Sequence, residues 1–205
     1  KIKFALHRKG YRKIKVGHAG TLDPLATGVL IVCIGRATKM VEQLQAEEKE
    51  YTADLMLGAT TPSYDMEHPV DRTFPTEHIT REAVEQALAS LKGERLQAPP
   101  LYSAKKVEGV RAYEFARAGE EVELRKNLIN IYDLQLERCE LPSIGIRVRC
   151  SKGTYIRSLA AEIGEALESG AYLTSLRRVR SGGFTAEGAM SVTDFLEMLE
   201  KIEDK

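Results

Sequence analysis

A two-residue alternation between Ser143 and Lys152 constrains the fold of this chain more than any other segment. The sequence S-I-G-I-R-V-R-C-S-K places three aliphatic residues and a cysteine on one side and two arginines on the other. Successive side chains of a β-strand point to opposite faces. The segment therefore predicts a strand with one apolar face and one partly basic face.

Shorter patterns predict the other elements. Strand-forming residues predict strands at Val29–Gly35, Lys49–Gly58 and Asn130–Leu141. Apolar residues three and four positions apart predict helices at Thr80–Lys92, Tyr155–Glu168 and Ser191–Ile202, with a weaker helical segment at Ala37–Glu47. The first strand is almost continuously apolar, as in a strand covered on both faces. Three prolines between Thr60 and Glu77 indicate an exposed loop.

The order of these elements indicates the fold class. Strands and helices follow one another without a strict strand–helix–strand rhythm, and the chain has no internal repeat and no long linker. The sequence therefore predicts an α+β (mixed α/β) fold with a largely antiparallel mixed sheet flanked by helices and loops. A single domain over residues 1–205 is the simplest organisation.

The composition excludes several classes of protein. Hydrophobic content of 43% and charged content of 29% are typical of a soluble globular chain. No apolar run reaches the roughly 18 residues of a membrane span, and no signal peptide is evident. The three cysteines, Cys33, Cys139 and Cys150, are far apart and form no metal-binding pattern, so we expect neither a disulfide scaffold nor a zinc site. A reducing, cytoplasmic location is expected.

Charge is unevenly distributed, although the formal net charge is zero. Residues 1–40 carry nine Lys or Arg against one Asp, and later segments offset this excess. A polyanion responds to the local field, so a basic face can bind phosphates on a neutral protein. A set of solvated charged faces is the alternative interpretation.

The segment from Gly17 to Gly28, G-H-A-G-T-L-D-P-L-A-T-G, is the most unusual stretch. Its glycines allow sharp turns and close approach of a ligand, and Pro24 favours an extended backbone at Asp23. An ionised carboxylate presented from such a loop can act as nucleophile or base. A structural turn, in which Asp23 caps the next residues, is the competing interpretation. A phosphate-binding P-loop is excluded because no Gly-Lys-Ser/Thr follows.

Several motifs in order resemble one enzyme family. The segment K-V-G-H-A-G-T-L-D-P-L-A-T-G-V-L at residues 15–30 is similar to the catalytic motif of the bacterial TruB family of tRNA pseudouridine synthases. Further similar blocks are G-R-A-T-K at 35–39, K-E-Y at 49–51, P-L-Y-S-A-K-K-V-E-G at 100–109, C-S-K-G-T-Y-I-R-S-L at 150–159 and L-R-R at 176–178. Together they extend over most of the chain.

The resemblance implies a reaction and a substrate. Members of the family isomerise uridine 55 in the T loop of tRNA by breaking the N1–C1′ bond, rotating the uracil and rejoining it through C5. The family needs no metal and no cofactor, and we expect a monomer that requires no protein partner and no membrane. The target base must leave its stack before the glycosidic bond can be reached. Either attack on C1′ or removal of the C2′ proton, giving a glycal, remains open.

The resemblance also implies roles for individual residues. Asp23 corresponds to the catalytic aspartate, Tyr51 to the tyrosine that stacks on the base and helps remove the C5 proton, and Arg157 to the arginine that pairs with the aspartate. The residues implied in substrate or RNA binding are His18, Asp65, Lys106, Tyr155, Leu176, Arg177 and Arg178. Lys105, Arg111 and Arg180 are additional candidate phosphate contacts. Without the motifs, Tyr51 would be interpreted as a core residue and Arg157 as a surface residue.

The chain departs from the family pattern in three places. The family's K-P-x-G-x-T-S segment, which would precede the basic start of the chain, is expected to be missing, and no C-terminal PUA domain is expected after Phe184. The segment Thr61-Pro62-Ser63-Tyr64-Asp65 differs from the usual T-D-T-x-D, in which Asp65 keeps the second acidic position.

Three other functions would fit parts of the same sequence. The guide-RNA-dependent archaeal and eukaryotic branch shares the catalytic loop, but the S-A-x-K-x-x-G block and compact length favour the stand-alone bacterial type. A non-catalytic RNA-binding module would use the same surface. An aspartate-nucleophile phosphatase is disfavoured because no second Asp follows Asp23 by two residues.

Overall fold

The computed structural model describes residues 1–103, 106–107, 110–112, 114–115 and 124–202. Its helices are α1 (Ile2–Arg8), the 3₁₀ helix η1 (Gly35–Met40), α2 (Val41–Ala46), α3 (Arg81–Ser90), α5 (Ile156–Ala166) and α6 (Val192–Glu200). Its longer strands are β4 (Lys49–Leu57), β7 (Gly93–Gln97), β10 (Asn127–Glu140), β11 (Ser143–Cys150) and β12 (Ala171–Ser181). Its short strands are β1 (Val16–His18), β2 (Ala26–Gly28), β3 (Val32–Ile34), β5 (Ala59–Thr60), β6 (Arg72–Thr73), β8 (Lys106–Val107), β9 (Val110–Arg111) and β13 (Phe184–Thr185).

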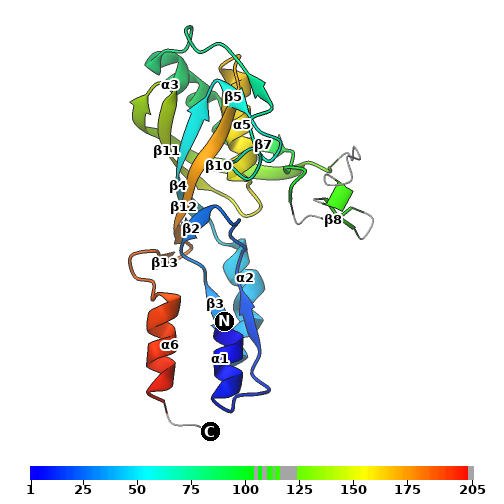
Figure 1. Cartoon of the computed structure of the whole chain (residues 1–205), viewed down its shortest axis with the longest axis vertical. Coiled ribbons are helices and arrows are strands. Elements are labelled where there is room, and N and C mark those ends of the chain that lie inside the picture. Colours follow the sequence, from blue (N-terminus) through cyan, green and yellow to red (C-terminus); the bar gives the residue numbers. More distant parts are fainter. Residues whose placement is uncertain (104–105, 108–109, 113, 116–123, 203–205) are drawn as a thin grey trace.

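A seven-stranded sheet forms the upper body of the molecule (Figure 1). Its strands follow the order β13-β12-β4-β11-β10-β7, and neighbours along this path pair antiparallel. The short strand β2 joins β12 in parallel register. The predicted α+β class and largely antiparallel sheet are therefore confirmed, as is the strand predicted from the Ser143–Lys152 alternation.

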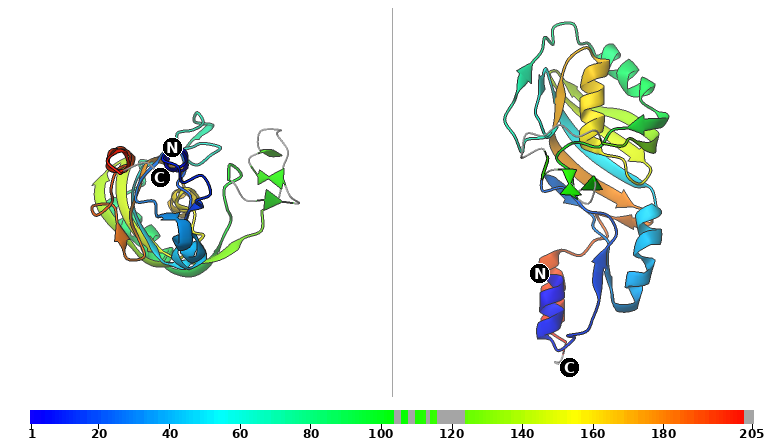
Figure 2. Two further views of the ribbon diagram at one scale, coloured as in Figure 1. Left: turned by 90° about the horizontal axis from the view of Figure 1, so that it is seen from below. Right: turned by 90° about the vertical axis from the view of Figure 1, so that its right-hand side faces the viewer.

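Helices cover one face of this sheet. The curved strands wrap around α5, which lies in the concave side (Figure 2), and α3 packs on β10. Alternate residues of β4 and β11 face these helices, and Leu55, Ile144 and Leu159 are fully buried there. Thr80 caps α3 with its side chain, and Ser191 forms a capping box with Asp194 at the start of α6, so these predicted helices are confirmed.

The opposite face of the sheet carries paired charges. Arg147 donates to Glu50 at 2.8 Å and to Glu137 at 2.5 Å, and Arg180 donates to Glu48 at 2.6 Å. Arg149 also bonds Glu48, at 3.0 Å. The partly basic face predicted for the Ser143–Lys152 strand is therefore neutralised by carboxylates on neighbouring strands.

The N-terminal segments and α6 form a lower lobe (Figure 1). In this lobe β1 pairs with β3, and Ile31 and Cys33 pack with apolar residues of η1 and α2. The strand predicted at Val29–Gly35 is present over Val32–Ile34, but the expectation that both of its faces are covered was wrong. The strand is three residues long and Leu30 is 39% exposed, because the two-stranded sheet has apolar neighbours on one side only.

The segment after β4 also differs from its prediction. Thr61, Ser63 and Asp65 are each at most 3% exposed, so the exposed loop expected at Thr60–Glu77 is partly buried. The Thr61 hydroxyl donates to the Asp65 carbonyl at 2.7 Å, and Asp65 forms a parallel bridge with Leu173 of β12. The proline-rich composition predicted an exposed loop, but hydrogen bonds to the sheet hold part of this loop inside the protein.

Membrane spans and metal-binding clusters are both absent from the described ranges. No helix there is long and apolar enough to cross a membrane. No group of three His, Cys, Asp or Glu residues within them is placed to hold a metal ion. Cys33 and Cys150 are buried and free, as expected for small apolar residues.

The packing of β4 against the helices generates a stability prediction. Replacing the fully buried Leu55 with Ala should lower the free energy of unfolding by about 2–5 kcal/mol, because it removes buried apolar surface and leaves a cavity. Leu128, which is 67% exposed on β10, is the matched control, and Leu128→Ala should change it by less than about 0.5 kcal/mol. Urea denaturation measures both, and equal losses would contradict the assigned burial.

Candidate active site

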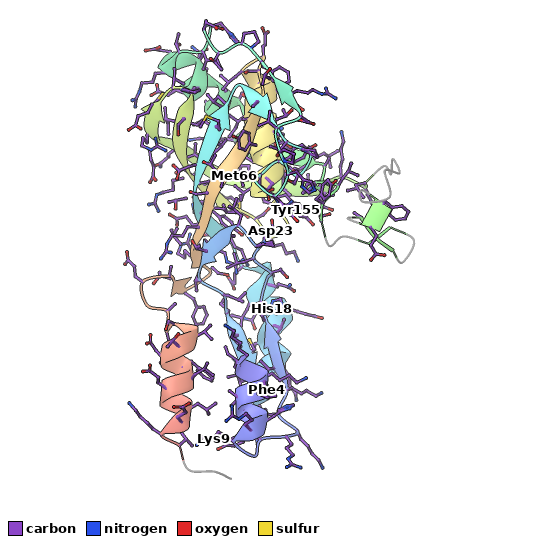
Figure 3. All side chains as sticks on the ribbon, in the orientation of Figure 1. Phe4, Lys9, His18, Asp23, Met66 and Tyr155 are labelled. Atoms are coloured by element: carbon purple, nitrogen blue, oxygen red, sulfur yellow. The ribbon has the colours of Figure 1, made fainter. Side chains whose placement is uncertain are left out.

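Asp23 lies in the loop between β1 and β2, at the junction of the two lobes (Figure 3). The amide of Ala26 donates to the carbonyl of Asp23 at 2.9 Å, which closes a tight turn with Pro24 at its second position. The backbone thus makes the turn, and the side chain receives its hydrogen bond from Arg157 instead. The alternative in which the Asp23 side chain caps the following residues is therefore wrong.

The parallel pairing of β2 with β12 fixes this loop against the main sheet. Ala26 lies opposite Leu176, and the amide of Val29 donates to the carbonyl of Arg178 at 2.9 Å. Gly28 has a φ of +101°, and a Cβ there would lie 2.1 Å from the Arg178 carbonyl oxygen. Only glycine permits this approach, which explains the glycine at the end of the loop.

Arg157 binds the Asp23 carboxylate from inside the protein. Its Nε lies 2.8 Å from Asp23 Oδ2, and its Nη1 donates to the carbonyls of Ser63 at 3.2 Å and Tyr102 at 3.0 Å. The Arg157 side chain is 5% exposed and that of Asp23 is 38% exposed. The ion pair is thus anchored on one side and open on the other, so Asp23 can meet a substrate while its direction is fixed.

Asp65 is a second carboxylate behind the same arginine. Its Oδ2 lies 3.8 Å from Arg157 Nε, and its Oδ1 accepts hydrogen bonds from Ser63 at 2.6 Å and from the Glu67 amide at 3.0 Å. Asp65 is only 3% exposed. Asp65 therefore stabilises Arg157 and its own loop from inside the protein. The predicted direct contact of Asp65 with RNA was wrong, because its contacts are internal.

Tyr51 lies on β4, opposite Arg178 of β12. It is 9% exposed, and burial raises the pKa of its hydroxyl to about 12, with a smaller contribution in the same direction from the charge of Asp23. The charge of Arg178 acts in the opposite direction and lowers the pKa of this hydroxyl. At neutral pH the phenol is protonated, so it can donate a hydrogen bond and can accept a proton only while passing its own on.

Tyr155 and Leu176 border the same space. Figure 3 places Tyr155 next to Asp23, and burial and the Asp23 charge raise the pKa of its hydroxyl. Leu176 is 7% exposed and lies between β2 and β4 in register with Ala26 and Ala53. An aromatic ring and an aliphatic side chain beside the carboxylate provide flat apolar contacts of the kind that a base requires.

Two expected RNA contacts are exposed and one is not. His18 ends β1 and is exposed below the loop (Figure 3), and Arg177 is exposed on β12. Arg178 is 2% exposed and donates to the carbonyls of Val29 at 2.8 Å and Gly20 at 3.1 Å. The predicted contact of Arg178 with phosphate is therefore wrong. Adjacent residues of a strand face opposite sides, and Arg178 lies on the side that faces the protein interior.

The remaining candidate phosphate contacts are Arg180, Lys105, Lys106 and Arg111. Arg180 is paired with Glu48 and Glu50 on the outer face of the sheet, so it is not a free cation. Lys106 lies on β8, which pairs with β9. The side chains of Lys106 and Arg111, and the whole of Lys105, lie outside the described residues.

Sequence reasoning missed Gln97 and the structural role of Lys49. Gln97, 1% exposed, exchanges two hydrogen bonds with the backbone of Tyr155, at 2.8 and 3.2 Å, and so fixes the start of α5 beside Arg157. Lys49 is buried and donates to three carbonyls at the end of α2. A lone Gln carries no local signal, whereas the lysine of K-E-Y stood in a recognised motif.

Sequence models of known families match this chain. A sequence model described as TruB family pseudouridylate synthase (N terminal domain) matches residues 8–156. A second, described as tRNA pseudouridylate synthase B C-terminal domain, matches residues 157–205. The chain belongs to the TruB family of pseudouridylate synthases. The family predicted from the motifs is therefore confirmed.

Curated relatives cover nearly the whole chain. The tRNA pseudouridine synthase B of Phocaeicola vulgatus is 57% identical over 204 residues, which cover 99% of this chain and 87% of the relative. That of Flavobacterium johnsoniae is 50% identical over 189 residues, 92% of this chain and 82% of the relative. That of Clostridium perfringens is 45% identical over 199 residues, 96% and 68%.

Solved structures share the fold. A Cbf5-Nop10-Gar1 complex contains a chain with a TM-score of 0.71 and 29% identity, matched over 96% of this chain and 49% of that one. An H/ACA RNP bound to a substrate RNA containing 2′-deoxyuridine gives 0.65 and 28%, over 93% and 48%. The TruB chain thus spans about half of these solved chains.

The contact between Gly28 and β12 generates a second prediction. Gly28→Ala should destabilise the protein by more than Gly93→Ala, because both positions have φ near +100° but a Cβ at Gly93 meets nothing within 4 Å. Gly93→Ala should cost about 1–2 kcal/mol for its backbone conformation alone. Urea denaturation measures both variants, and equal costs would mean that β2 does not pack on β12 as described.

Proposed function

We propose that this protein isomerises uridine to pseudouridine in the T loop of tRNA, with Asp23 as the essential catalytic carboxylate. The observation that carries the proposal is the Asp23–Arg157 ion pair, which is buried on the arginine side and open on the aspartate side. The family assignment and the names of relatives up to 57% identical support the tRNA substrate. Uridine 55 as the target follows from the motif resemblance.

The chemistry needs a carboxylate and space for a rotating base. Asp23 either attacks C1′ or removes the C2′ proton, and in both routes the N1–C1′ bond breaks and the uracil departs with the bond electrons. The uracil turns and C5 forms the new bond to C1′. In the first route this breaks the Asp23–C1′ bond and releases the carboxylate, and in the second Asp23 returns the proton to C2′. The C5 proton is then lost and N1 ends with a proton, so atoms and electrons balance without an oxidant or reductant.

Neighbouring residues have distinct parts in this proposal. Arg157 donates a hydrogen bond to the Asp23 carboxylate and directs it at the sugar. Tyr51 and Leu176 contact the extruded base, and Tyr155 borders the space beside Asp23. Because burial keeps the Tyr51 phenol protonated, this residue assists removal of the C5 proton by relaying it rather than by acting as a standing base.

The stand-alone type is favoured over the guide-RNA-dependent type. Curated relatives named tRNA pseudouridine synthase B are 45–57% identical and are covered over 63–89% of their length. The solved Cbf5 chains are 26–29% identical and are covered over about half of theirs. The greater similarity to the former supports direct action on tRNA.

The distribution of free positive charge supports a polyanionic substrate. A cavity of about 620 Å³ in the lower lobe has Lys3, Arg12, Lys13 and Lys15 among its lining residues, with Glu42 as the carboxylate among them. None of these four cations forms an ion pair with any part of the chain that the structure describes, in contrast to the arginines of the sheet's outer face. Strand β1 leads from this cavity to the catalytic loop.

The first prediction from this function concerns turnover. Asp23→Asn should abolish isomerisation while tRNA binding changes by no more than a few-fold, because the amide keeps the shape but loses the charge of the carboxylate. Tritium release from a C5-tritiated tRNA transcript measures turnover. The matched control is Asp133→Asn, which should retain activity. Asp133 lies on β10, and its carboxylate pairs with Lys92. Normal turnover by Asp23→Asn would refute the mechanism.

A second prediction concerns salt. The triple variant Arg12→Gln, Lys13→Gln and Lys15→Gln should weaken tRNA binding and reduce the slope of log affinity against log salt by about 2, since each phosphate contact contributes roughly 0.7–0.9. Filter binding over a range of salt concentrations measures the slope. Arg138→Gln with Arg147→Gln, two paired cations of the sheet, should leave the slope unchanged. An unaltered slope in the triple variant would exclude the lower lobe as a phosphate-binding surface.

A further inference from the structure

Arg178 occupies an unusual position for an arginine. Its guanidinium is buried, and it donates from Nε to the carbonyl of Val29 and from Nη2 to the carbonyl of Gly20. Those two carbonyls flank the catalytic loop on its two sides, since Asp23 lies between them in sequence. The backbone of Arg178 adds a third contact, because its own carbonyl accepts the amide of Val29.

The hydrogen-bond partners of the Arg178 side chain are two backbone carbonyls rather than a carboxylate. No ion pair joins it to a carboxylate within the described ranges, although the arginines on the outer face of the sheet are paired. Burying a charge without a counter-ion is unfavourable, so hydrogen bonds must compensate. Lys49 is a second buried cation, and its pKa is lowered first by burial and then by the charge of Arg178, so the two charges repel each other. The burial of a cation at this cost in free energy indicates that Arg178 does more than stabilise the fold.

We infer that Arg178 is a positioning residue that holds the catalytic loop closed at its base and keeps Asp23 in register with Tyr51. The planar guanidinium has donors in a fixed fork, which suits two carbonyls that arrive from different directions. Tyr51 lies opposite Arg178 in the strand register, and the charge of Arg178 acts on its hydroxyl. The side chain that bonds both sides of the loop therefore also lies beside the residue proposed to relay the C5 proton.

The expected effect on catalysis rests on the proposed function, whereas the hold of Arg178 on the loop rests on the contacts above. If the guanidinium is lost, the loop remains attached through β2 but its carbonyls at Gly20 and Val29 lose their donor. Asp23 then samples directions other than that set by Arg157. A misplacement of about 1 Å in a reacting group can cost on the order of 100-fold in rate.

The test compares Arg178→Met and Arg178→Lys with the wild type and with Arg147→Met, which removes a paired arginine of the outer sheet face. The limiting single-turnover rate constant is measured with a C5-tritiated tRNA transcript at saturating enzyme. We expect both Arg178 variants to fall by about 100-fold with tRNA affinity within a few-fold, and Arg147→Met to match the wild type. Lysine should not rescue the rate, because one ammonium cannot span both carbonyls.

The limiting rate constant separates positioning from stability. A smaller folded fraction changes how much enzyme is needed for saturation, but not the rate constant reached there. If Arg178 only stabilises the fold, Arg178→Met melts earlier and keeps the wild-type limiting rate, which would overturn the inference. Full rescue by Arg178→Lys would overturn the proposed fork contact.

A second measurement does not depend on activity. Hydrogen exchange in peptides covering residues 17–30 should accelerate on the order of tenfold in Arg178→Met, while peptides of β11 keep their protection. Unchanged exchange in the loop would overturn the inference even if turnover falls. If the wild type itself fails to isomerise tRNA, the proposed function fails, and the exchange data still decide whether Arg178 holds the loop.

Discussion

The buried guanidinium of Arg157 is the interaction on which the rest of the site depends. It joins the catalytic loop at Asp23, the loop after β4 at Ser63 and the segment before β8 at Tyr102. A charge this deeply buried is stable only when its donors are satisfied. The three segments must therefore be in place together, and the direction of the carboxylate becomes a property of the folded whole rather than of a mobile loop.

The site lies where the two family sequence models meet. Asp23 and Tyr51 belong to the region matched by the N-terminal model, whereas Arg157 and Arg178 belong to that matched by the C-terminal one. In the structure, α5 packs on β12 and β12 pairs with β4, so elements of both matched regions share one sheet and its core. The ion pair between Asp23 and Arg157 crosses this boundary and makes each half incomplete as a site.

Much of the local structure was predictable because its causes are local. The strand at Ser143–Cys150 follows from a two-residue period, and the starts of α3 and α6 follow from capping residues that bond their own first turn. Predictions failed where distant neighbours decide burial. Residues 29–35 form a short strand with one covered side, and Asp65 is buried because its loop bonds to β12.

Local patterns and motifs were enough to predict the fold class, most of its elements and a carboxylate in a glycine-rich loop. They could not separate Arg177 from Arg178. The strand period requires that these two side chains point to opposite faces, but it does not say which face the catalytic loop will cover. That depends on β2 pairing with β12 some 150 positions away in the sequence, a contact that forms only in the folded chain. Tertiary structure alone therefore exposes one arginine and encloses the other.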